Sequence, residues 1–223
     1  MRVVIAGGHG KIALLLERML TERGDQAVGL IRNPAQADEV EQTGAVPVVL
    51  DLEAVSAADV AGVLADTDAV VFAAGAGPGS SAARKDTVDR GASVLLAEAA
   101  GLAGVRRFIQ ISGMGVEQPP AAGADEVWAA YLAAKAAAEE DLRARDLDWT
   151  ILRPGGLTDD PPTGKVALGV PPLPRGQVSR ADVAAVILTL LDERGTSHQT
   201  LELTSGSAPV GGAAREIAAQ LGH

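Results

Sequence analysis

The chain has 223 residues, no cysteine, and 29 acidic against 19 basic side chains, which gives a formal net charge of −10. This length suits a single α/β domain with a large core. The negative charge argues against a nucleic-acid partner, and the lack of cysteine excludes disulfides and thiolate metal sites. The three histidines, His9, His198 and His223, are far apart in sequence, so we expect no metal site. No apolar run approaches the ~18 residues of a membrane span, so we expect a cytoplasmic protein without a membrane partner.

The first motif is VVIAGGHGKIALLL, residues 3–16. An apolar run of strand length precedes the glycines, and apolar residues at helical spacing follow them. A nucleoside-triphosphate loop would need Ser or Thr after Lys11, where the chain has Ile12. The remaining pattern, Gly7-x-x-Gly10-x-x-Ala13, is typical of a dinucleotide-binding turn at a helix N-terminus. An ordinary strand-to-helix turn is the alternative.

Strands and helices alternate in the predictions that follow. We expect the first helix to end near Arg23-Gly24. Further strands are predicted over 26–31, 45–50, 68–74, 107–112 and 149–153, and helices over 35–42, 56–65, 83–103 and 125–145. This alternation predicts an α/β fold with a Rossmann-type, doubly wound parallel sheet.

The pattern loosens after residue 153. Residues 158–176 are rich in proline and glycine and are predicted to form a loop with at most one short strand near 165–168. A helix containing Val183 to Leu191, a strand near 200–203 and a helix near 213–221 complete the chain. We expect one domain over 1–223, with a core over 1–153 and a small C-terminal substrate-side region over 154–223.

The end of the second predicted strand bears on the choice of cofactor. This position carries Arg32, with Asn33 beside it, where an acidic residue would bind a free ribose 2′-hydroxyl. A guanidinium can hold a 2′-phosphate, so NADP(H) is preferred over NAD(H), and Lys11 adds positive charge nearby. At the end of the third strand, Asp51 and Leu52 could contact adenine. A solvated arginine and a simple turn or helix cap are the respective alternatives.

A second motif, YLAAK, contains Tyr131, which is the sole tyrosine of the chain, and Lys135. On a helix these two side chains share one face. The ammonium should lower the pKa of the tyrosine, which could then exchange a proton with a carbonyl oxygen. A surface lysine beside a half-buried tyrosine is the alternative.

Together with Ile111-Ser112 and TILRPGGL, residues 150–157, these motifs resemble the atypical, extended-type short-chain dehydrogenase/reductases. The likeness is to their compact NAD(P)H-binding branch, which includes NmrA-like and biliverdin/flavin-reductase-like proteins. The resemblance implies that Ser112, Tyr131 and Lys135 are catalytic and that Lys135 bonds the nicotinamide ribose. The cofactor-binding residues expected in total are Gly7, Gly8, His9, Gly10, Lys11, Ile12, Arg32, Asn33, Asp51, Leu52, Ala73, Ala74, Gly75, Ser112, Lys135, Pro154, Gly155 and Leu157.

One departure bears on activity, because Gly113 stands where catalytic relatives typically carry the polarising serine or threonine. The first functional hypothesis is an NADP(H)-dependent oxidoreductase that acts on a small carbonyl, quinone or flavin-like acceptor. The second is an NADP(H)-binding redox sensor of NmrA type, and the third is a sugar epimerase or dehydratase. We expect a small-molecule substrate, for which loop residues Asp159, Asp160 and Lys165 are candidates, and a monomer or homodimer.

Overall fold

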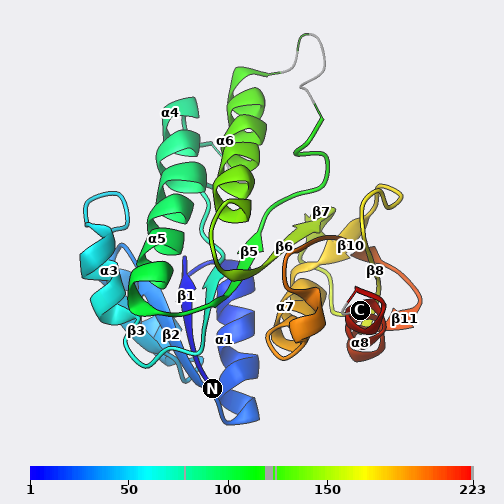
Figure 1. The fold of residues 1–223 in the computed structure, drawn as a ribbon, viewed down its shortest axis with the longest axis horizontal. Helices are drawn as coiled ribbons and strands as arrows, with labels where there is room; N and C mark the ends of the chain where they lie inside the picture. Colours follow the sequence, from blue (N-terminus) through cyan, green and yellow to red (C-terminus); the bar gives the residue numbers. More distant parts are fainter. Residues whose placement is uncertain (78, 119–122, 124, 222–223) are drawn as a thin grey trace.

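The computed structural model describes residues 1–77, 79–118, 123 and 125–221, so His223 lies outside it. A nine-stranded sheet forms its centre, in the order β11-β8-β10-β6-β5-β4-β1-β2-β3 (Figure 1). Seven neighbouring strands, from β10 to β3, are parallel, whereas β8 and β11 pair antiparallel. The predicted Rossmann-type α/β fold is therefore confirmed.

The strands of this sheet have the following bounds. They are β1 (Arg2–Ala6), β2 (Gln26–Ile31), β3 (Val46–Val49), β4 (Ala69–Phe72), β5 (Arg107–Ile111), β6 (Asp148–Pro154), β8 (Lys165–Gly169), β10 (Gln199–Ser205) and β11 (Ala208–Pro209). The helices are α1 (Lys11–Arg23), α2 (Ala37–Glu41), α3 (Ala57–Val63), α4 (Ala82–Arg84), α5 (Ser93–Ala103), α6 (Glu126–Arg143), α7 (Arg180–Leu190) and α8 (Val210–Leu221). Short 3-10 turns span Pro34–Gln36 and Arg194–Thr196.

The two faces of the sheet bury two separate apolar clusters, as the alternation of side chains along β1 requires. Val3 and Ile5 join a cluster with residues of α1, α7 and α8. Val4 and Ala6 point the other way and join a cluster with residues of α3 and α5. Aliphatic side chains dominate both clusters, and the second also holds Phe72, Phe108 and Trp149. Helices cover both faces of the sheet (Figure 1).

Two regions differ from the sequence prediction. The helix predicted over 83–103 consists of α4, a π-helical segment (Lys85–Ala92) and α5. The region predicted as a loop contains β7 (Gly156–Thr158), which pairs with β9 (Gln177–Ser179) in a small parallel sheet of its own. Neither β7, β9 nor β11 was expected.

None of the helices among the described residues is both long and apolar enough to cross a membrane.

Candidate active site

A cavity of about 310 Å³ opens at the carboxyl ends of β1 to β4. In a doubly wound sheet this is the edge where ligands bind. Nine predicted cofactor residues line it, namely Gly7, His9, Gly10, Arg32, Asp51, Leu52, Ala73, Ala74 and Gly75. Glu53, Arg84 and Val88 also line it and were not predicted.

The glycine turn is held by close backbone packing. Gly7 has a φ of +79°, and a Cβ atom there would lie 2.7 Å from the Cα of Ala74. A Cβ on Gly8 would lie 2.6 Å from the Cα of Gly29. Gly10 begins α1 without a side-chain cap and without an acidic residue in the first turn. The uncapped N-terminus of α1 thus leaves backbone amides available to an anion.

Other residues of this segment have different neighbours. Lys11 turns toward the C-terminal region, where its ammonium lies 2.5 Å from Asp159. Ile12 packs against the core, and the Asn33 side chain accepts a hydrogen bond from the Ala35 amide as the cap of a 3-10 turn. Gly8, Lys11, Ile12 and Asn33 are therefore absent from the cavity lining.

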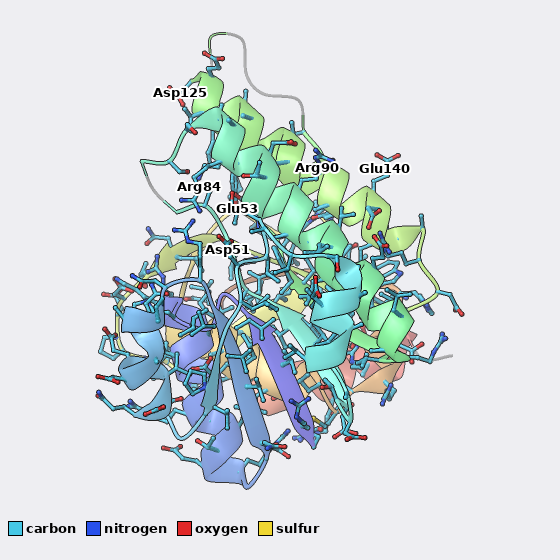
Figure 2. All side chains as sticks on the ribbon, turned by 90° about the vertical axis from the view of Figure 1, so that its left-hand side faces the viewer. Asp51, Glu53, Arg84, Arg90, Asp125 and Glu140 are labelled. Atoms are coloured by element: carbon cyan, nitrogen blue, oxygen red, sulfur yellow. The ribbon has the colours of Figure 1, made fainter. Side chains whose placement is uncertain are left out.

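Acidic and basic side chains meet at the cavity (Figure 2). Glu53 accepts hydrogen bonds from Arg32 at 3.2 Å, from Arg84 at 2.8 Å and from the Thr87 hydroxyl at 2.7 Å. The hydrogen bond from the Thr87 hydroxyl lowers the pKa of Glu53 below its ordinary value, and Arg84 and Arg32 lower it further. Partial burial of the carboxylate acts in the opposite direction. The side chain of Asp51 accepts a hydrogen bond from the backbone amide of Glu53 at 3.0 Å, which fixes the turn after β3.

Tyr131 and Lys135 lie on α6, and Lys135 has polar partners from two other segments. The Lys135 ammonium lies 3.4 Å from Asp89 and donates to the carbonyl of Ile111 at 3.2 Å. Asp89 also accepts a hydrogen bond from the backbone amide of Ala76. Ala76 directly follows Gly75, which lines the cavity. A Cβ on Gly113 would lie 3.2 Å from the Tyr131 hydroxyl, so the small residue leaves that oxygen room.

The surroundings of the Tyr131 ring are aromatic and cationic. The ring stacks on Trp128, with 5.2 Å between ring centroids, and the Lys85 ammonium lies 5.5 Å from its centroid. Lys85 is itself buried and donates to the carbonyl of Gly77.

The predicted lowering of the Tyr131 pKa by Lys135 is wrong. Burial, with added repulsion from Asp89 and Glu139, raises the pKa of Tyr131 to about 12. Burial lowers the pKa of Lys135, while Asp89 acts in the opposite direction. Asp89 offsets the lysine charge at short range, so Tyr131 remains a neutral hydroxyl at physiological pH and is suited to donate a proton.

Ser112 has a partner that the sequence did not indicate. Its hydroxyl donates to Glu139 at 2.6 Å, and both groups are buried. Glu139 also accepts two hydrogen bonds from Arg153 and one from Arg143. The hydrogen of the Ser112 hydroxyl is therefore already engaged within the protein, away from the cavity lining.

The expected nicotinamide wall lies beyond the described cavity, whose lining includes none of Pro154, Gly155 and Leu157. Pro154 ends β6, and Leu157 lies in β7 with its residue 38% exposed. Gly155 donates to Leu203, and a Cβ there would lie 2.2 Å from the carbonyl oxygen of Gly176. Close backbone packing thus requires glycine at residue 155.

Four relevant side chains escaped sequence reasoning: Glu53, Arg84, Asp89 and Glu139. None of them belongs to a recognisable motif. The spacing of Lys135 and Glu139 does place both on one face of α6. Helical spacing was therefore the available signal for Glu139, whereas the others come together through the tertiary fold.

Similar proteins are known for this arrangement. Residues 7–194 match the profile of a family described as NAD(P)H-binding. A Bacillus subtilis protein named as an uncharacterized sugar epimerase is 32% identical, with coverage of 97% of this chain and 100% of that protein. A Bacillus halodurans structure, provisionally named an NAD-dependent epimerase/dehydratase, is 34% identical with a TM-score of 0.88, covering 97% of this chain and 100% of that one. ChuY, an anaerobilin reductase from Escherichia coli O157:H7, is 25% identical with a TM-score of 0.76, covering 92% and 97%.

Proposed function

Because the chain belongs to the NAD(P)H-binding family, we propose that it is an NADP(H)-dependent oxidoreductase acting on a small carbonyl, quinone or flavin-like acceptor. The observation that carries this proposal is the surroundings of Tyr131. Its hydroxyl faces the small residue Gly113, and buried Lys135 lies one helical turn away. A neutral hydroxyl with space beside it suits proton transfer to an acceptor oxygen.

The residues around the cavity fit a dinucleotide. A Cβ on Gly7 would meet the backbone of Ala74 and one on Gly10 the carbonyl oxygen of Gly7, so only glycine permits this tight turn, and the uncapped start of α1 offers amides to a diphosphate. Asp51 and Leu52 would contact adenine, Ala73 to Gly75 would line the cofactor, and Arg32 would hold a 2′-phosphate. When bound, the cofactor supplies or accepts the hydride.

The protein's own part in the reaction centres on Tyr131. Its raised pKa keeps the proton on the oxygen until an acceptor oxygen gains negative charge. Lys135 lies one turn along the same helical face, and because Asp89 offsets its charge, it stabilises the phenolate left after donation only weakly. Asp89 fixes Lys135 by an ion pair, and Trp128 fixes the tyrosine ring by stacking.

Ser112 and Gly113 favour a second candidate, an NADP(H)-binding redox sensor. The Ser112 hydroxyl donates to Glu139, and Gly113 has no side chain with which to polarise a substrate. A sugar epimerase or dehydratase comes third, in line with the name of the Bacillus subtilis relative. Turnover separates the first two candidates.

The test begins with fluorescence titrations by NADPH and NADH, followed by a panel of quinones, flavins and aldehydes added to the saturated protein. We expect tighter NADPH binding and acceptor-dependent oxidation. Tyr131→Phe keeps the ring that stacks on Trp128 but removes the proton, so binding should persist while oxidation falls about 100-fold or more. Tight binding without oxidation by any acceptor would favour the sensor.

A further inference from the structure

A carboxylate lies between two guanidinium groups at the cavity. Glu53 follows β3, Arg32 follows β2, and Arg84 ends α4, so three separate segments meet at one anionic group. Figure 2 labels Glu53 and Arg84 of this group. Both arginines contact the same oxygen, Oε2, at 3.2 and 2.8 Å, while the Thr87 hydroxyl donates to Oε1 at 2.7 Å. The donors thus surround one anion from several sides.

This donor set has capacity for a larger anion than a carboxylate. Arg32 and Arg84 both line the cavity, with side chains 52% and 39% exposed. The Nε of Arg84 is buried and has no hydrogen-bond partner among the described residues. A phosphate monoester carries more charge and more acceptor oxygens than a carboxylate, and paired guanidiniums suit it well.

We propose that Arg84 forms, together with Arg32, the site for the cofactor's 2′-phosphate, and that Glu53 competes with this phosphate for both arginines. The inference rests on the NADP(H) preference proposed above. A 2′-phosphate must displace the Glu53 carboxylate or share the guanidiniums with it. Glu53 therefore weakens NADP(H) binding more than NAD(H) binding, because only NADP(H) brings the second anion to this point.

The experiment isolates the adenosine end of the cofactor by using 2′,5′-ADP and 5′-AMP as probes in calorimetric titrations. Glu53→Gln should tighten 2′,5′-ADP binding about tenfold and change 5′-AMP binding less than about twofold, because one nearby negative charge is removed. Arg84→Gln should weaken 2′,5′-ADP binding about tenfold. Glu53→Ala serves as a second variant if Glu53→Gln folds poorly.

Arg90→Gln is the matched control, because it removes a positive charge from the adjoining helical segment. Arg90 pairs with exposed Asp86 and does not line the cavity (Figure 2), so this variant should bind both probes as the parent does.

Two failures can be told apart. If the parent binds 2′,5′-ADP no better than 5′-AMP, and Glu53→Gln does not change this, both the NADP(H) preference and the inference are overturned. If the parent prefers 2′,5′-ADP, but Glu53→Gln does not tighten it or Arg84→Gln does not weaken it, the inference alone is overturned. Tightening by Glu53→Gln together with weakening by Arg84→Gln supports it.

Discussion

The ammonium of Lys135 lies 3.4 Å from the carboxylate of Asp89, and both side chains are almost fully buried. The second oxygen of Asp89 accepts a hydrogen bond from the backbone amide of Ala76. The carboxylate of Asp89, in the π-helical segment, thus links this segment to α6 and to the loop after β4. This pair accounts for the weak influence of Lys135 on Tyr131, because the lysine charge is compensated at close range.

Removal of the charge on Asp89 should destabilise the fold. Asp89→Asn leaves a buried ammonium without its counter-ion, and loss of one partner of a buried pair costs ~3 kcal/mol. Urea unfolding at neutral pH measures this change.

Asp86→Asn is the matched control, because Asp86 lies one turn earlier and forms an exposed pair with Arg90. We expect its free energy of unfolding to change by less than ~0.5 kcal/mol. If both variants lost the same free energy of unfolding, the buried ion pair of Asp89 would contribute no more to stability than an exposed pair.

Glu17 should make stability depend on pH. It is fully buried beneath the glycine turn, and one of its oxygens, Oε1, lacks a hydrogen-bond partner among the described residues. Burial raises its pKa from 4.5 to about 8, opposed by the Thr43 hydroxyl. Between these values the folded chain holds a proton that the unfolded chain releases, so the free energy of unfolding falls as pH rises.

Glu17→Gln should remove this loss. Between about pH 4 and pH 7 the parent should lose ~3 kcal/mol of stability relative to Glu17→Gln, as measured by urea unfolding at both pH values. Glu22→Gln, on the exposed side of α1, should follow the parent. A pH-independent difference between Glu17→Gln and the parent would show that the carboxyl keeps its ordinary pKa.

Gly8 should not tolerate alanine. A Cβ would lie 2.6 Å from the Cα of Gly29, and backbone on both sides must shift to admit it. We expect Gly8→Ala to lose ~2 kcal/mol of stability and to bind NADPH more weakly, as measured by thermal unfolding and fluorescence titration.

Gly101→Ala is the control, because it makes the same glycine-to-alanine change at a position where a Cβ atom has room. A Cβ at Gly101 in α5 meets nothing within 4 Å, so alanine should stabilise the chain by up to ~1 kcal/mol through helix propensity. A similar loss in both variants would refute the packing argument for Gly8.

Tyr131 can be titrated directly, because it is the chain's single tyrosine. Near-ultraviolet absorbance of the phenolate should show a midpoint at about pH 12 in the folded protein. The unfolded chain in denaturant should titrate near the ordinary value of ~10. A folded-state midpoint at or below that of the unfolded chain would restore the lowered pKa first expected from Lys135.

Sequence patterns predicted most of the sheet because each parallel strand is a short apolar run between turn residues. The prediction of 26–31 coincides with β2, whose buried residues come from both faces. β7 and β9 were missed because three-residue strands carry little periodicity and gain their pairing from a segment about twenty residues away. The π-helical segment was also missed, because helical spacing does not distinguish it from α-helix.

The candidate site was predictable where a motif exists. Gly7 and Gly10 are recognisable from spacing, and Arg32 from its place after a strand. Glu53 and Arg84 are thirty-one residues apart in sequence and meet through the fold. The pKa of Tyr131 depends on burial and on Asp89, which the spacing of two residues on one helix cannot reveal.

Every residue that lines the cavity lies between Gly7 and Ala92, whereas Tyr131 and Lys135 follow β5. The first half of the chain thus supplies the cavity lining, and it also reaches α6, where Lys85 lies over the Tyr131 ring and Asp89 pairs with Lys135. Natural or engineered variation confined to residues 107–221 can reshape the surroundings of Tyr131 while the lining of the cavity keeps its composition. A chimaera joined just before β5 would therefore retain the cavity lining, and it would keep the partners of α6 only if the new second half also carries a tyrosine and a lysine that suit Lys85 and Asp89.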